Sequence, residues 1–91
     1  MRTFKKMRSI NLSYAAQGYI FFLCKTLQEQ PEEIQRKVLN LCVEIGGADY
    51  AALYEVLTSG KSVRAVSIKS FVPERRLYSL RKNFYESWRK K

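Results

Sequence analysis

Apolar residues recur at helical spacing along most of this chain. Between residues 32 and 46 they stand at i, i+4, i+7 and i+11, as Ile34, Val38, Leu41 and Ile45. This spacing is typical of one face of an amphipathic helix. Pro31 suits the start of that helix, and the pair Gly46-Gly47 suits its end.

The same periodicity predicts four more helices, over about Asn11–Glu29, Ala48 or Asp49–Thr58, Val63–Ser70 and Pro73–Trp88. Only four glycines and two prolines occur in 91 residues, which disfavours a fold rich in β-turns. We therefore expect an all-α fold, a compact bundle of about five helices in one domain. Residues 1–10 are expected to form a flexible basic arm, residues 11–60 supporting helices, and residues 61–91 a helix-turn-helix with a basic tail.

The first predicted helix is apolar on more than one face. A small core does not cover so many large side chains, so we expect this helix to contribute to self-association, as in a homodimer. The residues in question are Tyr19, Ile20, Phe21, Phe22 and Leu23.

Charge is segregated along the chain. The net charge is +9, with 17 basic and 8 acidic residues. Residues 9–60 hold three basic and six acidic residues, whereas residues 61–91 hold ten basic and two acidic ones. A polyanion would be attracted to the C-terminal third. The alternative is a solvated charged surface without a partner.

Other functional classes lack the residues they need. There is no histidine, and Cys24 and Cys42 stand alone in apolar stretches, where we expect buried, reduced thiols. A Cys/His zinc site is thereby excluded, and no nucleophile–base pair or phosphate-binding glycine loop is present. We expect neither an enzyme nor a metal or other cofactor. The longest apolar run, residues 19–24, is too short to cross a bilayer, so we expect a cytoplasmic protein without a membrane partner.

Residues 62–81 predict a helix-turn-helix: a short helix, a tight turn and a longer basic helix. Val66 followed by the small Ser67 suits the point where the two helices cross, and Val72 suits the apolar plug of the turn. Leu77 and Leu80 are placed to point inward. At 100° per residue, Phe84 and Trp88 lie on the same side as these leucines, and all six apolar residues are expected to be buried.

This stretch resembles the helix-turn-helix of sigma factor region 4 and of phage and mobile-element transcription activators of the RinA/ArpU kind. The resemblance covers about a third of the chain. It departs at Phe71, where the pattern usually has glycine, and at Ser70, where it usually has an apolar residue. The resemblance implies binding of double-stranded DNA, with the second helix in the major groove.

A groove-reading helix uses the exposed face of its first two turns. The candidates for base or sugar contacts are therefore Arg75, Arg76, Ser79 and Tyr78, and the two arginines suit bidentate binding of guanine. Those for phosphate contacts are Lys61, Arg64, Lys69 and Lys82.

Three functions are compatible with this pattern. The first is a sequence-specific transcription regulator of a phage or mobile element, for which RNA polymerase is a further partner. The second is a DNA-packaging protein of the small-terminase kind. The third is a protein-interaction adaptor or anti-repressor, whose basic face meets an acidic partner.

Overall fold

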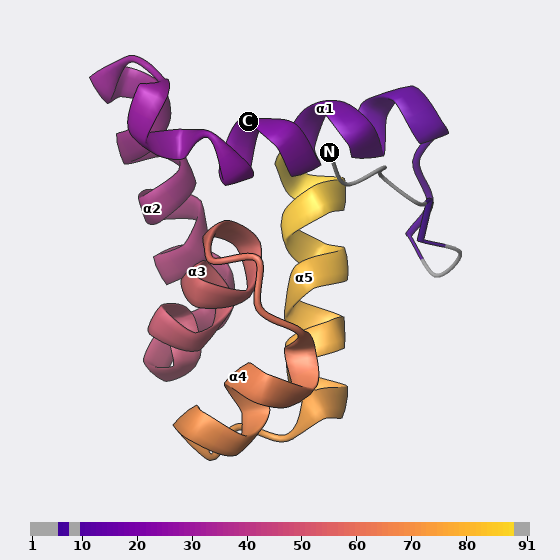
Figure 1. Ribbon diagram of the computed structural model, residues 1–91, viewed down its shortest axis with the longest axis vertical. Coiled ribbons are helices and arrows are strands. Elements are labelled where there is room, and N and C mark those ends of the chain that lie inside the picture. Colours follow the sequence, from indigo (N-terminus) through magenta and orange to yellow (C-terminus); the bar gives the residue numbers. More distant parts are fainter. Residues whose placement is uncertain (1–5, 8–9, 89–91) are drawn as a thin grey trace.

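Helices account for all regular secondary structure in the computed structural model, which describes residues 6–7 and 10–88 (Figure 1). The α-helices are α1 (Tyr14–Lys25), α2 (Glu32–Gly46), α3 (Tyr50–Thr58), α4 (Val63–Ser70) and α5 (Glu74–Trp88), with 3-10 turns at Leu27–Glu29 and Gly47–Asp49. No strand occurs within the described residues, which confirms the all-α prediction. The molecule measures 30 × 27 × 26 Å. None of these helices is both long and apolar enough to cross a bilayer.

Helix α1 is shorter than expected at both ends. Ser13 caps its start, because the Ser13 hydroxyl oxygen accepts a hydrogen bond from the backbone N–H of Ala16 at 3.1 Å. At the other end, the Thr26 hydroxyl donates to the carbonyl oxygen of Phe22, and a 3-10 turn follows. The predicted range Asn11–Glu29 was therefore too long, because capping side chains end the helix inside it.

The segment before α1 is fastened to the fold by one buried amide. Gln17 is fully buried, and its side-chain nitrogen lies 3.1 Å from the carbonyl oxygens of Met7, Ile10 and Leu12. Its side-chain oxygen accepts from the Met7 backbone N–H at 2.8 Å. Ile10 is buried in the core and Met7 packs against it. The expectation of a flexible arm was therefore wrong for these two residues; residues 1–5 and 8–9 of that arm, and residues 89–91 of the basic tail, lie outside the described residues.

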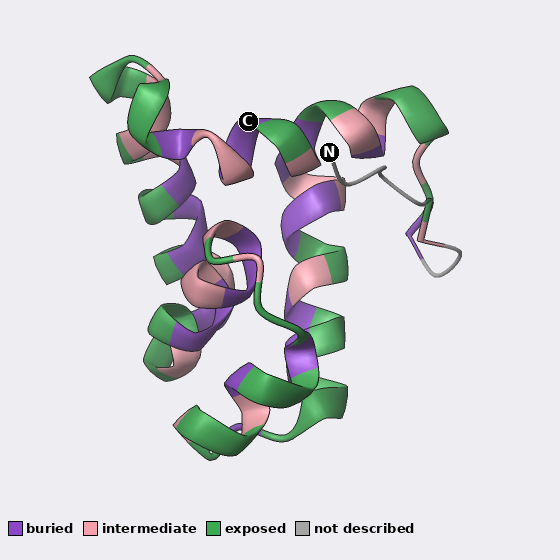
Figure 2. Ribbon diagram, in the orientation of Figure 1, coloured by how far each residue is buried: buried purple, intermediate pink, exposed green. Residues whose placement is uncertain are grey.

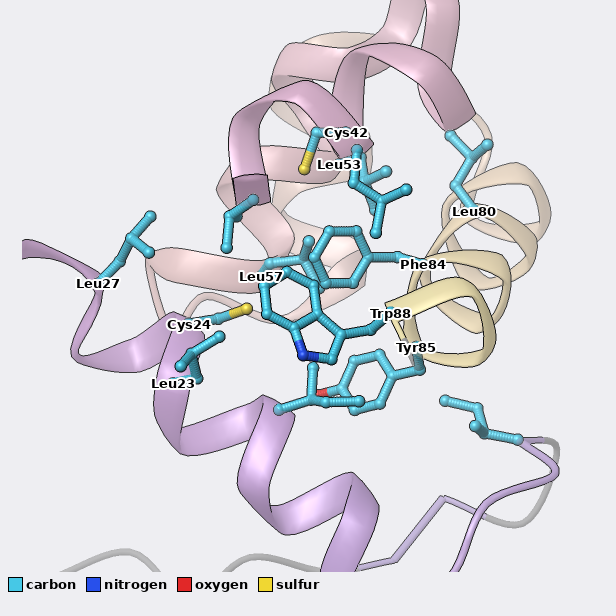
Figure 3. Close-up of a cluster of buried hydrophobic side chains, with 14 residues drawn as sticks. Leu23, Cys24, Leu27, Cys42, Leu53, Leu57, Leu80, Phe84, Tyr85 and Trp88 are labelled. Carbon is cyan, nitrogen blue, oxygen red and sulfur yellow. The ribbon is translucent and has the colours of Figure 1, made fainter. Parts of the chain in front are cut away.

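The main core lies where α1, α2 and α3 meet the C-terminal half of α5 (Figures 2 and 3). Phe84 stacks with Trp88 at a centroid distance of 5.8 Å, and the Lys37 ammonium lies 4.0 Å from the Trp88 ring centroid. Cys24 and Cys42 are free and buried here, as predicted, and burial raises the pKa of each thiol to about 12.

A second, smaller apolar cluster holds α4 and the start of α5 against α3. It consists of Ala52, Val56, Val63, Val66, Val72 and Leu77. All six residues expected to be buried on the C-terminal helices are buried, namely Val66, Val72, Leu77, Leu80, Phe84 and Trp88. Helix α5 therefore links the two clusters, with its first turns at α4 and its last turns in the main core (Figure 1).

Candidate nucleic-acid interface

Helix α4 begins and ends at side-chain hydrogen bonds. Ser62 caps its start, since its hydroxyl oxygen accepts from the backbone N–H of Ala65 at 3.1 Å. Near its end, the Ser67 hydroxyl donates to the carbonyl oxygen of Val72, and the Ser70 hydroxyl donates to that of Val66, both at 2.6 Å. These bonds fix the direction in which the chain leaves α4 and enters α5.

The connection between α4 and α5 turns at a residue in the left-handed conformation. Phe71 has φ +61° and ψ +28°, and its backbone N–H donates to the carbonyl oxygen of Ser67. Glycine is the usual residue in this conformation, because a Cβ is strained there. The Phe71 side chain is 91% exposed. The turn thus has the backbone geometry that a glycine would give, and the backbone of Phe71 is strained.

The outward face of α5 is basic and accessible. Arg75, Tyr78, Ser79 and Lys82 are all exposed, on the side away from the buried Leu77 and Leu80. A shallow depression lies over the first turn of the helix, lined by Pro73, Arg75, Arg76 and Ser79. Neither Arg75 nor Lys82 forms a salt bridge with any residue that the structure describes, and the same holds for Arg64 on α4.

Arg76 differs from its neighbour Arg75. Its Nε donates to the carboxylate of Asp49, and its terminal nitrogen lies 3.4 Å from the carbonyl oxygen of Gly46. The arginine thereby ties the first turn of α5 to the end of α2 and to the 3-10 turn that follows. Helical spacing does not reveal this role of Arg76, because Asp49 lies 27 residues away in sequence and only the fold brings the two together.

Two of the expected phosphate-binding residues share an internal partner. Lys61 and Lys69 both lie with their ammonium nitrogens 3.1 Å from one carboxylate oxygen of Glu55 on α3. The hydrogen bond from Lys69, followed by that from Lys61, lowers the pKa of Glu55 below its ordinary value. Both lysines remain exposed, but part of their charge is balanced inside the protein.

Arg81 is a further basic residue of this region that the sequence pattern did not single out. Its guanidinium lies 5.1 Å from the ring centroid of Tyr78. Its Nε is buried and finds no hydrogen-bond partner within the described part of the chain. Desolvation by burial lowers the pKa of this guanidinium. Arg81 lies beside the buried face of α5. Helical spacing alone assigns this side of the helix to the core, so the sequence pattern did not indicate Arg81 as a candidate.

The expected self-association residues on α1 divide between core and surface. Ile20 and Leu23 are buried in the main core, so the expectation that they meet another molecule was wrong. Phe21 is half-buried, and the Lys25 ammonium lies 5.7 Å from its ring centroid. Tyr19 and Phe22 are exposed, and Tyr14, which the apolar pattern did not single out, is exposed beside them.

No protein-family model, no curated protein and no solved structure matches this chain. The assignment of a function therefore rests on these side chains and their surroundings.

Proposed function

We propose that this protein is a five-helix domain that binds double-stranded DNA in a sequence-specific manner, with α4, the connection 71–73 and α5 acting as a helix-turn-helix. In this assignment α5 enters the major groove with its first two turns, and α4 lies across the backbone. The transcription-regulating role, on a phage or mobile element, follows from the resemblance to sigma factor region 4 and the RinA/ArpU activators.

The observation that carries the proposal is the outward face of α5. Arg75, Ser79 and Lys82 are exposed on one side of a helix whose other side, with Leu77 and Leu80, is fixed in apolar clusters. A rigid helix with an accessible basic face is what groove reading requires, since base contacts depend on a fixed approach angle. Residues 61–88 carry seven basic and two acidic side chains, which favours attraction to phosphate.

Roles follow from the partners that each side chain has. Arg75 is the first candidate for a bidentate guanine contact, with Ser79 and Tyr78 beside it for base or sugar contacts. Lys82 and Arg64 are assigned to phosphates. Arg76 is paired with Asp49, and Lys61 and Lys69 are paired with Glu55. These three residues contact DNA only if they share or release their carboxylate partners, so we assign them a smaller contribution to DNA affinity.

The test is selection of duplexes from a random pool with the purified protein, followed by a salt titration of binding to the selected duplex. The proposal predicts an enriched motif and a binding constant that falls steeply with salt, with a slope of about −0.9 per neutralised phosphate. Recovery of no motif, together with weak and salt-insensitive binding, would contradict it. An acidic protein partner would then be the better assignment for this face.

A further inference from the structure

The outer side of α1 carries an uncharged, partly aromatic surface. Tyr19 is 59% exposed, Tyr14 55% and Phe22 45%. With Ala15 and Gly18 between them, these residues form one stripe, here termed the α1 face. The sequence from Ile10 to Cys24 contains no charged residue, in a chain of which 27% is charged. Exposed aromatic side chains gathered on a neutral face are typical of interaction surfaces.

The α1 face points directly away from the core. At 100° per residue, Gly18 and Phe22 lie opposite the buried Ile20 and Cys24. The buried side of α1 meets Tyr85 and Trp88 at the C-terminal end of α5 (Figure 3). The α1 face therefore lies at one end of the molecule.

The basic region lies at the other end. Helix α5 has 15 residues and is about 22 Å long at 1.5 Å per residue. Its last turns pack on α1, and its first turn follows α4. Helices α1 and α4 accordingly occupy opposite ends of the long axis in Figure 1, which measures 30 Å. A partner on the α1 face thus leaves Arg75 and Lys82 accessible.

We propose that the α1 face binds a second copy of this chain about a twofold axis. Charge favours this face for a second copy, since two proteins of net charge +9 repel one another through any basic face and meet with least repulsion through a neutral one. The face is also suited to self-complementary packing. Gly18 stands one turn from both Tyr14 and Phe22 on this stripe, so a second helix can approach closely at the glycine while the aromatic residues flank the contact.

The arrangement of DNA on this dimer rests on the proposed function of α5. Two molecules joined at their α1 ends hold their α5 first turns at the two far ends of the assembly, about 60 Å apart, which is twice the 30 Å axis. A palindromic site read on one face of a duplex needs recognition helices only about 34 Å apart and facing the same way. The dimer is therefore built to bridge two separate DNA segments.

Sedimentation equilibrium of the purified protein tests the dimer without DNA. The wild type is expected at twice its 10.7 kDa mass, and Phe22→Glu at 10.7 kDa. The matched control is Leu39→Glu on α2, where the wild-type side chain is similarly exposed at 42%. This control should stay dimeric, and circular dichroism of each variant confirms its fold. A monomeric wild type at several hundred micromolar, or a dimer that Phe22→Glu leaves intact, would overturn the proposal.

Bridging is tested by capturing a labelled duplex on beads that carry a second, biotinylated duplex of the selected sequence. Wild type and Leu39→Glu should retain the labelled duplex, whereas Phe22→Glu should bind a single duplex with at most a twofold change in affinity and retain none. A dimer that binds DNA and captures no second duplex would overturn the bridging geometry. Failure of DNA binding itself would count against the proposed function and leave the sedimentation result to decide the dimer.

Discussion

The hydroxyl of Ser67 donates a hydrogen bond to the carbonyl oxygen of Val72, 2.6 Å away, across the turn between α4 and α5. Val72 is buried beside Val66 and Leu77, and this part-buried bond gives its carbonyl oxygen a partner within the fold. A small residue at position 67 thus permits the close approach of the two helices and also satisfies the turn. The strain of the connection is concentrated one residue away, at Phe71.

Replacement of Phe71 by glycine is expected to stabilise the protein. The left-handed conformation costs a residue with a Cβ about 1–2 kcal/mol, and the greater entropy of an unfolded glycine offsets about 0.5–1 kcal/mol of the gain. The ring is 91% exposed, so little packing is lost with it. Chemical denaturation should therefore show Phe71→Gly more stable by about 0.5–1 kcal/mol, with Phe71→Ala close to wild type. A less stable glycine variant would show that the ring makes contacts in solution.

Arg76→Ala is expected to reduce stability, in contrast to Arg75→Ala. Arg76 loses its bonds to Asp49 and Gly46, whereas Arg75 has no salt bridge with a described residue. Because the Arg76 side chain is 48% exposed, its ion pair is screened by solvent, and we expect a loss of about 0.5–1 kcal/mol. Thermal denaturation of both variants measures this. Equal melting temperatures for the two would mean that the Asp49 pair adds nothing.

Glu55→Gln is expected to strengthen binding to any duplex. The substitution releases Lys61 and Lys69 from their shared carboxylate, so both become available to phosphates, and the salt dependence should steepen by a slope of up to about two. Glu33→Gln on the exposed side of α2 is the control, because it changes the net charge by the same amount in the same direction. Unchanged affinity and slope would indicate that these lysines do not face DNA.

The same residue gives the wild type a pH dependence of stability. The lysines lower the pKa of Glu55 in the folded state from its ordinary value of 4.5. Its contribution to stability is therefore fully present above pH 4.5 and is lost as the pH falls through the lower folded-state pKa. Comparison of wild type and Glu55→Gln by denaturation at pH 7 and at acid pH isolates this contribution. The difference in stability between them should shrink as the pH falls.

Much of the C-terminal third could be predicted from spacing alone. Leu77, Leu80, Phe84 and Trp88 are buried because a helix of period 3.6 places them on one side, and Val72 is buried because a tight turn needs an apolar residue. These are local consequences of the sequence. The exposure of Arg75, Ser79 and Lys82 follows from the same geometry, so the candidate face of α5 could be predicted from the sequence.

Contacts between segments that are distant in sequence could not be predicted from spacing. The pairing of Arg76 with Asp49, and of Lys69 with Glu55, depends on how α3 packs against α4 and α5. The division of α1 into a buried side with Ile20 and an exposed side with Phe22 likewise depends on which neighbours cover it. An all-round apolar helix does not specify its orientation.

The role of Gln17 likewise depends on contacts that spacing does not predict. Gln17→Leu is expected to lower the free energy of unfolding by about 2–4 kcal/mol. Leucine fills a similar volume but removes the side-chain donor to the Leu12 carbonyl oxygen and the acceptor of the Met7 N–H, at about 1–3 kcal/mol for each group that water does not reach. The carbonyl oxygens of Met7 and Ile10 keep only their bonds from the backbone N–H groups of Ile10 and Leu12. Denaturant titration measures the loss. The exposed Gln28 provides the control, since Gln28→Leu should change stability by less than about 0.5 kcal/mol. Equal stabilities of the two variants would contradict the anchoring role of Gln17.

The DNA-reading role of α5 is tested most directly by the equilibrium binding of Arg75→Ala to the selected duplex and to a scrambled one at fixed moderate salt. Arg36→Ala is the control, because it removes the same charge from an exposed site on α2, where Arg36 pairs with Glu32. Arg75→Ala is expected to lose about 1–3 kcal/mol on the selected duplex, or roughly 5- to 150-fold in affinity, and much less on the scrambled one. Arg36→Ala should stay within twofold on both duplexes. Equal losses for the two variants, or no loss for Arg75→Ala, would contradict sequence reading by this helix.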